Sequence, residues 1–350
     1  MHPFITESRE AVAEYLRSYM QEVAPSFLDF EPWGGDVVDR LVEFALRGKL
    51  IRGSLVGMGY RLFRQERAPR SCHATGAAME LMQSFLLVHD DIMDQDDLRR
   101  GVPSMHAQYA GAAPVGDDPR RSHYGLSMGI CAGDVASMLA FDLIAGLDAP
   151  PSQVMQISRL FAREIAITGL AQMQDVHHGY VDAADDAAIM AVYTYKTGRY
   201  TFSLPLVAGA ILAGASSEQE AELAQMGEAL GRIFQIRDDR LGLFGSAEET
   251  GKPEASDVRE NKQTPYRNAV LRRMATDDPL RGLFGKADAT PREIEELRSW
   301  IRENGADQAV EDQVESDRIL VSEGIARLGL RPEGRAALEA LLAYNLDRRV

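Results

Sequence analysis

Five aspartates in two clusters are the residues of this sequence with the clearest chemical potential. In the first cluster, Asp90, Asp91 and Asp94 follow directly on an apolar run that begins near Glu80. On a helix, Asp90 and Asp94 lie one turn apart and point the same way. Three neighbouring carboxylates repel one another unless a cation lies between them, and Mg²⁺ is often held by one or two carboxylates together with substrate phosphates. The cluster therefore indicates either a magnesium site or the solvated acidic end of a surface helix.

The second cluster also follows the period of a helix. Gln235, Asp238, Asp239 and Gly242 are spaced at i, i+3, i+4 and i+7, which places them on one helical face. Two aspartate-rich helices that faced each other could hold several divalent cations. The histidines add no ligand spacing of their own, and His89 beside the first cluster is interpreted as a packed structural residue.

Several lysines and arginines stand near glycines and near the two aspartate clusters. Their side chains are the donors that bind phosphate in proteins. Any one of them, taken alone, is more often a solvated surface charge. Their placement in so acidic a chain indicates phosphate recognition by Lys49, Arg52, Arg99, Arg100, Lys196, Lys252 and Lys262.

The net charge limits the class of partner. The chain of 350 residues has 38 lysines and arginines against 53 aspartates and glutamates, a formal net charge of −15. Nucleic-acid binders and polybasic membrane-surface proteins need the opposite balance, because they neutralise phosphates with basic side chains. An anionic substrate is compatible with this charge only where cations intervene.

Helical periodicity dominates the chain and must position both clusters. Apolar residues recur at spacings of three and four, for example at Val12, Leu16 and Tyr19. No period-two runs or Asn-Gly turns predict strands. We therefore expect an all-α, single-domain bundle of ten or more helices over residues 1–350, with a motif core at about 48–265 and a C-terminal helical lobe at about 285–350.

Other features bear on the compartment. The two cysteines, Cys72 and Cys131, lie in helical segments and are interpreted as buried, reduced thiols. The first ten residues lack a signal-peptide pattern, and no uncharged apolar run is long enough to span a bilayer. We expect a cytoplasmic protein without a transmembrane segment.

Taken in order, these motifs resemble those of the trans-isoprenyl diphosphate synthases, also called polyprenyl synthetases. The motif of Asp90, Asp91 and Asp94 is weak evidence by itself, whereas the ordered set of motifs is specific. The resemblance spans roughly residues 48–265 and rests on Gly48–Arg52, Asp90–Asp94, Leu98–Gly101, Gln172–Asp175, Lys196–Gly198, Phe234–Asp239, Gly251–Pro253 and Lys262.

This resemblance implies a helical bundle around a deep central cavity, and it implies that the protein is a homodimer. It implies Mg²⁺-dependent condensation of isopentenyl diphosphate with allylic diphosphates of five to fifteen carbons, using three Mg²⁺ ions that Mn²⁺ can replace. The implied metal residues are Asp90, Asp91, Asp94, Asp238 and Asp239. The residues implied to bind the allylic diphosphate are Arg99, Lys196 and Lys252, and those implied to bind isopentenyl diphosphate are Lys49, Arg52, Gln83 and Arg100. The reacting centre would be lined by Lys196, Thr197, Gln172, Asp175 and Gln235, and chain length would be gauged by Phe85, Leu86 and Met82.

Such a reaction explains why the sequence needs no Ser-His-Asp set and no zinc motif. An allylic diphosphate loses its leaving group, the alkene of isopentenyl diphosphate attacks, and the departed diphosphate can take the proton. Metal ions, Lys and Arg stabilise the charge that develops on the leaving group. One departure from the family is Gly242, which stands where the second motif usually ends in a third aspartate.

Product length should depend on the residues just before the first cluster. Burial of each added five-carbon unit stabilises the bound chain by about 4 kcal/mol, so elongation proceeds until the floor of the cavity stops it. Leu86 lies one turn before Asp90 on the same stripe of the helix. Phe85 projects away from that stripe, and only the resemblance, here to geranylgeranyl diphosphate synthases, makes it a gauge. We expect a C20 product, with C15 or longer products as alternatives.

Two other classes remain open. A class I terpene cyclase shares the fold and the first motif, but it would have an Asn/Asp-Ser-Glu metal motif in place of Asp238-Asp239 and no isopentenyl site. A non-catalytic partner subunit would be distinguished by whether the purified chain consumes isopentenyl diphosphate.

Overall fold

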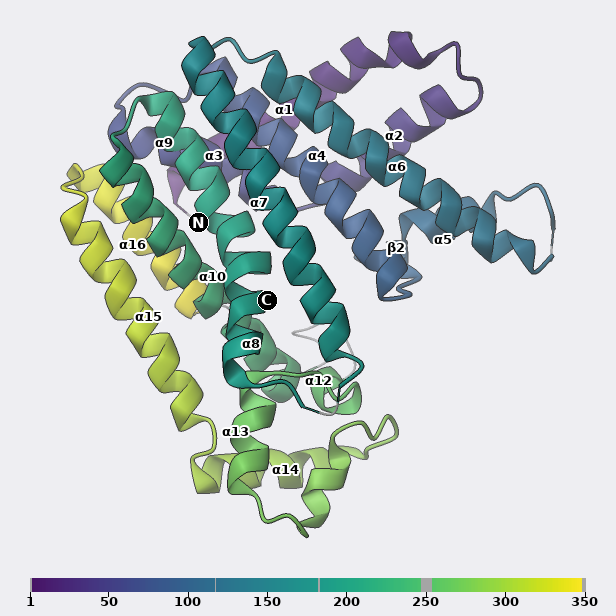
Figure 1. Cartoon of the computed structure of the whole chain (residues 1–350), viewed down its shortest axis with the longest axis vertical. Helices are drawn as coiled ribbons and strands as arrows, with labels where there is room; N and C mark the ends of the chain where they lie inside the picture. Colours follow the sequence, from purple (N-terminus) through teal and green to yellow (C-terminus); the bar gives the residue numbers. More distant parts are fainter. Residues whose placement is uncertain (1, 117, 182, 247–253, 348–350) are drawn as a thin grey trace. The chain divides into compact units, whose positions relative to one another are not determined.

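The computed structural model describes residues 2–116, 118–181, 183–246 and 254–347, and helices make up most of them (Figure 1). This confirms the predicted all-α fold with more than ten helices. η1 and η3 are short 3₁₀ turns, whereas η2 is a π-helix. In chain order the elements are α1 (Pro3–Val23), η1 (Ala24–Phe27), α2 (Trp33–Leu46), α3 (Ile51–Phe63), α4 (Arg70–Met93), β1 (Leu98–Arg99), β2 (Val102–Pro103), α5 (Met105–Gly111), α6 (Arg120–Ala145), α7 (Pro151–His178), α8 (Asp186–Val192), η2 (Tyr193–Ser203), α9 (Leu204–Ala213), α10 (Ser217–Phe244), α12 (Ser256–Arg259), α13 (Pro265–Arg273), η3 (Pro279–Leu283), α14 (Pro291–Asn304), α15 (Gln308–Arg327) and α16 (Pro332–Leu346).

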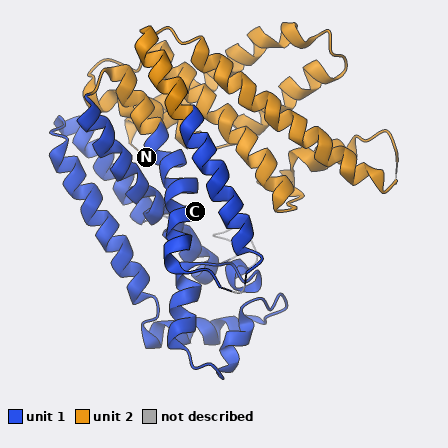
Figure 2. Ribbon diagram, in the orientation of Figure 1, with its two compact units in different colours: residues 1, 162–204, 216–350 blue, residues 2–161, 205–215 orange. Residues whose placement is uncertain are grey.

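The chain divides by its internal contacts into two compact units (Figure 2). Unit 1 comprises Ala162–Leu204 and Ser216–Val350, and unit 2 comprises His2–Phe161 and Pro205–Ala215. Helices α7 and α9 therefore contribute residues to both units. The expected single domain with a C-terminal lobe stays a prediction.

Helix α4 is the central element of unit 2 and carries the first aspartate cluster at its end. It begins after Pro69, whose fixed φ suits the start of a helix, and it ends at Asp94. Its side chains are mostly buried, and Met79, Leu81 and Met82 are fully so. Small residues such as Gly76 let α3 approach closely, because a Cβ there would lie 2.8 Å from the carbonyl oxygen of Gly53. This tight packing fixes the position of the acidic end.

Helix α10 carries the second cluster in unit 1. A capping box starts it: the Ser216 side chain accepts from the backbone of Gln219, and the Gln219 side chain accepts from the backbone of Ser216. The helix packs against η2 along a line of glycines, and a Cβ at Gly231 would lie 2.0 Å from Cα of Gly198. Glycine is required there because the two backbones almost touch.

Two details differ from the sequence-based expectation. The sequence predicted no strands, yet β1 and β2 form a two-residue antiparallel hairpin just after the first cluster. Both cysteines were expected to be buried, and Cys72 is, but Cys131 is exposed on α6. A helical period identifies an apolar face without saying whether this chain itself covers that face, which explains the second error.

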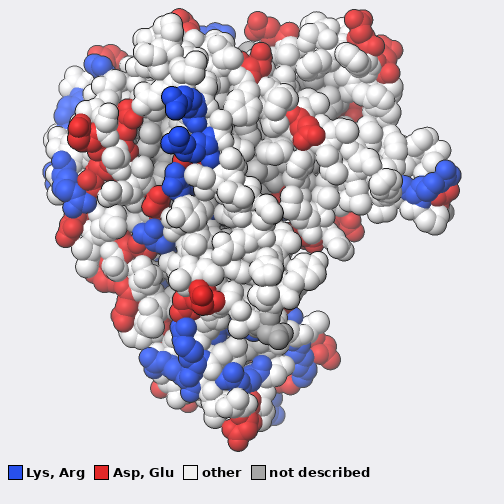
Figure 3. All heavy atoms as spheres, in the orientation of Figure 1, with Lys and Arg blue, Asp and Glu red and all other residues white. Residues whose placement is uncertain are grey.

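The surface mixes charges of both signs. On the face shown in Figure 3, acidic side chains are interspersed with basic ones. Within the part of the chain that the structure describes, α6 alone has the length and hydropathy to cross a membrane, and 50% of its most apolar window is buried in the protein. A buried core helix of the same composition passes the same test.

Candidate functional site

The acidic end of α4 separates its three aspartates by exposure. Asp90 is half-buried, Asp91 is fully buried, and Asp94, which caps the helix, is exposed. The backbone N–H of Asp94 donates to the carbonyl of Asp90 at 2.8 Å, so both residues belong to the last helical turn. Asp90 and Asp94 are therefore one turn apart, as the sequence predicts, while Asp91 lies against the protein.

Asp91 is paired with an arginine. The Arg99 guanidinium donates to Oδ1 of Asp91 from Nε at 2.6 Å and also from Nη2. Burial raises the pKa of Asp91, and the positive charge of Arg99 opposes that rise. Within the described chain, Oδ2 of Asp91 is buried and has no hydrogen-bond partner. Asp91 thus fixes Arg99 and keeps one oxygen available to a cation or a donor.

The hairpin after α4 presents two arginines. Arg99 ends β1, and the turn residues Arg100 and Gly101 both have left-handed φ angles, 54° and 76°. Two positive φ values in succession are typical of the two-residue turns that join antiparallel strands. This turn directs Arg99 to Asp91 and Arg100 toward the segment before α3.

Arg100 lies over Gly48, the residue next to Lys49. A Cβ atom at Gly48 would be 3.1 Å from Nη1 of Arg100, so glycine lets the guanidinium approach the backbone. Burial lowers the pKa of Arg100, and the like charges of Arg99 and Arg52 lower it further. A partly buried group of positive charges is suited to an anion such as phosphate.

A buried glutamate lies next to this basic group. Oε1 of Glu80 accepts a hydrogen bond from the backbone N–H of Gly53 at 2.7 Å. Burial raises the pKa of Glu80, and the backbone hydrogen bond with the charges of Arg52 and Arg100 opposes that rise. Nearer Asp90 on α4, Oε1 of Gln83 is buried without a hydrogen-bond partner among the described residues. We call Lys49, Arg52, Gln83, Asp90, Asp91, Asp94, Arg99 and Arg100 the α4 site; all of them belong to unit 2.

The three residues expected to gauge chain length precede this site on α4. Met82 is fully buried, and Phe85 and Leu86 are partly buried. The Phe85 ring meets the His89 ring edge to face, with centroids 4.7 Å apart. His89 is packed against Phe85, with 21% of its side chain exposed.

In unit 1, Asp239 is the centre of a hydrogen-bond network. Its buried carboxylate accepts from the Tyr193 hydroxyl, from Nζ of Lys262 at 3.0 Å and from Nε2 of Gln235 at 3.4 Å. Burial raises the pKa of Asp239 to about 6, although Lys262 opposes the shift. Asp238, the next residue, is only partly buried. The second motif therefore has one anchored carboxylate and one that is accessible.

The glycine that departs from the family pattern has a steric reason. A Cβ atom at Gly242 would lie 2.3 Å from Oδ2 and 2.4 Å from Cγ of Asp257. The Asp257 carboxylate is in turn 3.7 Å from Nζ of Lys262. Asp257 comes from α12, and it occupies the space into which a side chain at position 242 would project.

The π-helix η2 brings further candidate residues to α10. Eleven residues, Tyr193–Ser203, have this wider winding, which is frequent at functional sites. Oγ1 of Thr197 donates to Oε1 of Gln235 at 3.2 Å. Nζ of Lys196 donates to Oδ2 of Asp175 at 2.7 Å. Gln172 lies on α7 three residues before Asp175. We call Gln172, Asp175, Lys196, Thr197, Gln235, Asp238 and Asp239 the α10 site; all of them belong to unit 1.

Sequence reasoning missed two residues that lie beside the α10 site, Tyr193 and Asp257. Tyr193 stands three residues before Lys196, and that helical spacing was an available signal for it. Asp257 gave no signal, because its contact with Gly242 joins two helices that are fifteen positions apart in the sequence. Lys252, expected to bind a diphosphate, lies outside the described residues.

The donor chemistry of both sites fits Mg²⁺. Nowhere in the described ranges do three or more Asp, Glu, His or Cys side chains form a closed metal cage. Mg²⁺ does not need one, because it usually keeps several waters and takes one or two carboxylates with substrate phosphates. Asp90 and Asp94 would offer such carboxylates, with the buried Oδ2 of Asp91 beside them.

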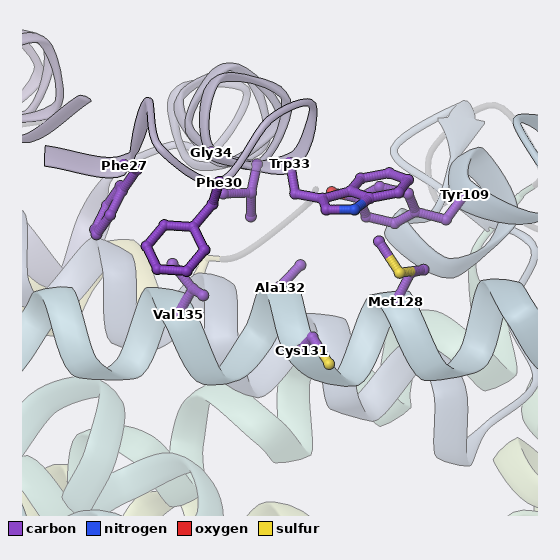
Figure 4. A pocket seen from close by; sticks show the side chains of 10 residues that line it. Phe27, Phe30, Trp33, Gly34, Tyr109, Met128, Cys131, Ala132 and Val135 are labelled. Carbon is purple, nitrogen blue, oxygen red and sulfur yellow. The ribbon is translucent and has the colours of Figure 1, made fainter. Parts of the chain in front are cut away.

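A separate apolar pocket lies on unit 2, with a volume of about 210 Å³ (Figure 4). Phe27, Phe30 and Trp33 lie on one side of it, and Cys131 and Val135 of α6 lie on the other. No candidate catalytic residue lines it.

Comparison with known proteins gives a family and a set of relatives. A family model described as polyprenyl synthetase matches residues 35–301. The chain is 33% identical to a geranylgeranyl diphosphate synthase of Sulfolobus acidocaldarius over 71% of this chain and 73% of that protein. It is 30% identical to a farnesyl diphosphate synthase of Geobacillus stearothermophilus over 75% of this chain and 82% of that protein.

A crystal structure is similar over nearly the full length. It is that of a geranylgeranyl pyrophosphate synthase from Corynebacterium glutamicum in complex with isoprenyl diphosphate and magnesium. The TM-score is 0.87 and the identity 27%, over 98% of this chain and 99% of that chain.

Proposed function

The chain belongs to the polyprenyl synthetase family, and from this premise we propose that it joins isopentenyl diphosphate head-to-tail to an allylic diphosphate. The product is a trans prenyl diphosphate, and the enzyme is a prenyltransferase. The observation that carries the proposal is the α4 site, where Asp90 and Asp94 lie one turn apart beside a partly buried group of basic side chains. Metal-binding carboxylates next to phosphate-binding cations are what a diphosphate substrate requires.

In this proposal the basic residues of the α4 site bind isopentenyl diphosphate. Lys49, Arg52 and Arg100 supply positive charge, and the buried Oε1 of Gln83 can accept a hydrogen bond from an ordered water. The Arg100 guanidinium lies close to the backbone at Gly48, where the absence of a side chain gives it room. With its diphosphate bound at the α4 site, isopentenyl diphosphate would keep its alkene free to react.

Other residues hold the allylic diphosphate and its metal ions. Asp90 and Asp94 would hold Mg²⁺ at the α4 site with Asp91 in support, and Asp238 would hold it at the α10 site with Asp239 in support. Bound Mg²⁺ would neutralise the charge that develops on the departing diphosphate. Arg99, fixed by Asp91, and Lys196, fixed by Asp175, would bind the same diphosphate together with Lys252. We propose three ions, with Mn²⁺ able to replace Mg²⁺.

The reaction then needs no nucleophile from the protein. The bond between C1 of the allylic substrate and its diphosphate oxygen breaks, and the electron pair leaves with the diphosphate. The alkene of isopentenyl diphosphate attacks C1, and the proton that is lost passes to the departed diphosphate. Thr197 and Gln235, hydrogen-bonded to each other, together with Gln172 and Asp175 would line the reacting centre and orient its polar groups.

We propose geranylgeranyl diphosphate, C20, as the main product. The relatives named above include synthases of C20 and C15 products, so the family alone leaves the length open. Phe85, Leu86 and Met82 precede the aspartates on α4 and are the proposed gauge of chain length. Farnesyl diphosphate or a longer product is the alternative.

The deciding experiment gives the purified chain isopentenyl diphosphate with C5, C10 or C15 allylic primers and Mg²⁺. We expect isopentenyl diphosphate to be consumed and a C20 diphosphate to accumulate, and we expect EDTA to stop turnover until Mg²⁺ or Mn²⁺ is restored. A hydrocarbon formed without consumption of isopentenyl diphosphate would indicate a terpene cyclase instead. No reaction with any primer would indicate a non-catalytic subunit.

We also propose that the enzyme is a cytoplasmic homodimer that pairs through α6. Ile130 and Met138 of this helix are 44% and 61% exposed, and Cys131 of the same helix lines the apolar pocket. Exposed apolar side chains in such a group are typical of an interface. Sedimentation velocity should give the mass of a dimer for the wild type and a weaker dimer for Met138→Asp, with Met155→Asp, equally exposed on α7, as the control. A monomeric wild type would contradict the proposal.

A further inference from the structure

The imidazole of His89 fills the space between α4 and α6. A Cβ atom at Gly133 of α6 would lie 2.6 Å from both Cδ2 and Nε2 of His89. No side chain fits at that distance, so α6 has a glycine opposite the histidine and the ring packs directly on the helix backbone. On its other side, the same ring meets the edge of Phe85 at a centroid distance of 4.7 Å and an interplanar angle of 62°.

The ring is held by polar contacts as well as by packing. Nε2 of His89 lies 3.3 Å from the backbone carbonyl oxygen of Ile130 and 3.7 Å from Oδ1 of Asp134. Donation to the carbonyl requires the proton on Nε2. The side chain is 21% exposed, so most of it is enclosed by α4 and α6. Two polar contacts from α6 and one aromatic contact from α4 leave the ring little freedom to turn.

The ring of Phe85 packs on this anchored imidazole. It is partly buried, and the ring contact with His89 is the aromatic contact that the described structure gives it. A ring packed against a fixed neighbour is restrained in its χ1 rotamer. His89 therefore restrains the Phe85 ring on the side where the two rings meet.

We propose that His89 is a positioning residue that sets product length by holding Phe85 between α4 and α6. The inference rests on the proposed function, in which Phe85 gauges the growing chain. His89 touches neither the diphosphates nor the reacting carbon in this scheme. It acts as a wedge: Gly133 gives it room, Ile130 and Asp134 anchor it, and Phe85 leans on it.

The first test removes the wedge. His89→Ala leaves a void beside Phe85 into which the phenyl ring can turn, so the gauge recedes. With a C15 primer and excess isopentenyl diphosphate, we expect the share of products longer than C20 to rise several-fold, while consumption of isopentenyl diphosphate stays within a few-fold of wild type. His89→Phe keeps an aromatic ring in the gap and should restore the wild-type distribution. His123→Ala, an exposed histidine on α6, is the matched control and should change nothing.

A second variant approaches the ring from the other side and keeps the histidine. Gly133→Ala places a methyl group where the imidazole now lies, which displaces the ring toward Phe85 and advances the gauge. We expect the products to shift from C20 toward C15. If His89 acts as a wedge, the two variants shift product length in opposite directions, whereas a general loosening of the packing would shift it in one direction. A melting curve establishes that each variant is folded.

The last test asks whether His89 acts through Phe85. Phe85→Ala should lengthen the product by itself, and adding His89→Ala to it should lengthen the product no further, because the residue that the wedge holds is gone. A folded, active His89→Ala or Gly133→Ala enzyme with the wild-type distribution would overturn the inference, and so would further lengthening in the double variant. A wild-type chain that consumes no isopentenyl diphosphate would overturn the proposed function itself.

Discussion

Gly242→Ala is the substitution for which the structure gives the sharpest expectation. The added methyl carbon would lie 2.3 Å from Oδ2 and 2.4 Å from Cγ of Asp257. Non-bonded carbon and oxygen atoms approach no closer than about 3.5 Å without strain, so the Asp257 carboxylate must move by about 1 Å or more. Any such movement changes the contact of Oδ2 with Nζ of Lys262, which is 3.7 Å away and also holds Asp239.

Two opposing effects set the magnitude. Overpacking a well-filled site costs about 1–3 kcal/mol. Replacing glycine by alanine inside a helix contributes about 1 kcal/mol in the other direction. The net expectation is a destabilisation of about 0–2 kcal/mol, which for a chain of 350 residues lowers the melting temperature by roughly 0–3 °C.

The matched control is Gly169→Ala. Gly169 lies inside α7 with nothing within 4 Å of an added Cβ, so only the gain in helix propensity applies and the melting temperature should rise. Differential scanning calorimetry of both variants gives the comparison. Asp257→Ala should remove the clash, so Gly242→Ala in that background should behave like the control.

If Gly242→Ala stabilises the wild-type chain as much as Gly169→Ala does, Asp257 does not occupy the space beside Gly242. Gly242→Asp, which restores the family's usual aspartate, should be worse than Gly242→Ala because it adds like charge as well as volume. A Gly242→Asp enzyme of wild-type stability would contradict the same geometry.

The remaining predictions concern activity, product and pH. Asp90→Ala should abolish consumption of isopentenyl diphosphate with little change in melting temperature, since the side chain is half-exposed and its role is to hold metal; near wild-type turnover would contradict that role. Phe85→Ala should give longer products by chromatography, because each further unit buries about 4 kcal/mol of apolar surface, and an unchanged length would remove Phe85 as a gauge. Burial raises the pKa of Glu80, so the stability that the neutral carboxyl contributes is full below its ordinary pKa and is lost as the pH rises through the raised one. Glu80→Gln should therefore gain in melting temperature relative to wild type between about pH 4.5 and about pH 7, and an equal difference at both pH values would show that Glu80 titrates normally.

The two aspartate clusters illustrate what a sequence can and cannot say about a site. Helical spacing placed Asp90 and Asp94 on one stripe and Asp91 off it, and the structure has them so, because residues within one helix obey its period. By the same spacing, Asp238 and Asp239 are equally good candidates for metal binding. The structure separates them: Asp239 is buried among Tyr193, Lys262 and Gln235, while Asp238 is accessible. That difference depends on which helix packs against which face.

Two glycines show what the sequence does not reveal. Gly242 was recognised in the sequence only as a missing aspartate, and Gly133 drew no notice. Each turns out to face a specific side chain from another element, Asp257 or His89. A glycine has no side chain whose chemistry could indicate its purpose, so only the neighbouring atoms reveal why it is there.

The sequence by itself determined the class of fold, the family and the candidate residues for diphosphate and metal, because these follow from local period and from the order of motifs along the chain. Only the tertiary structure decided which carboxylate each cation holds: Arg99 on Asp91, Lys196 on Asp175, and Lys262 between Asp239 and Asp257. It likewise decided that His89 lies between Phe85 and Gly133. These contacts join segments that are distant in sequence, and their distances are set by how helices pack, which no single helical period contains.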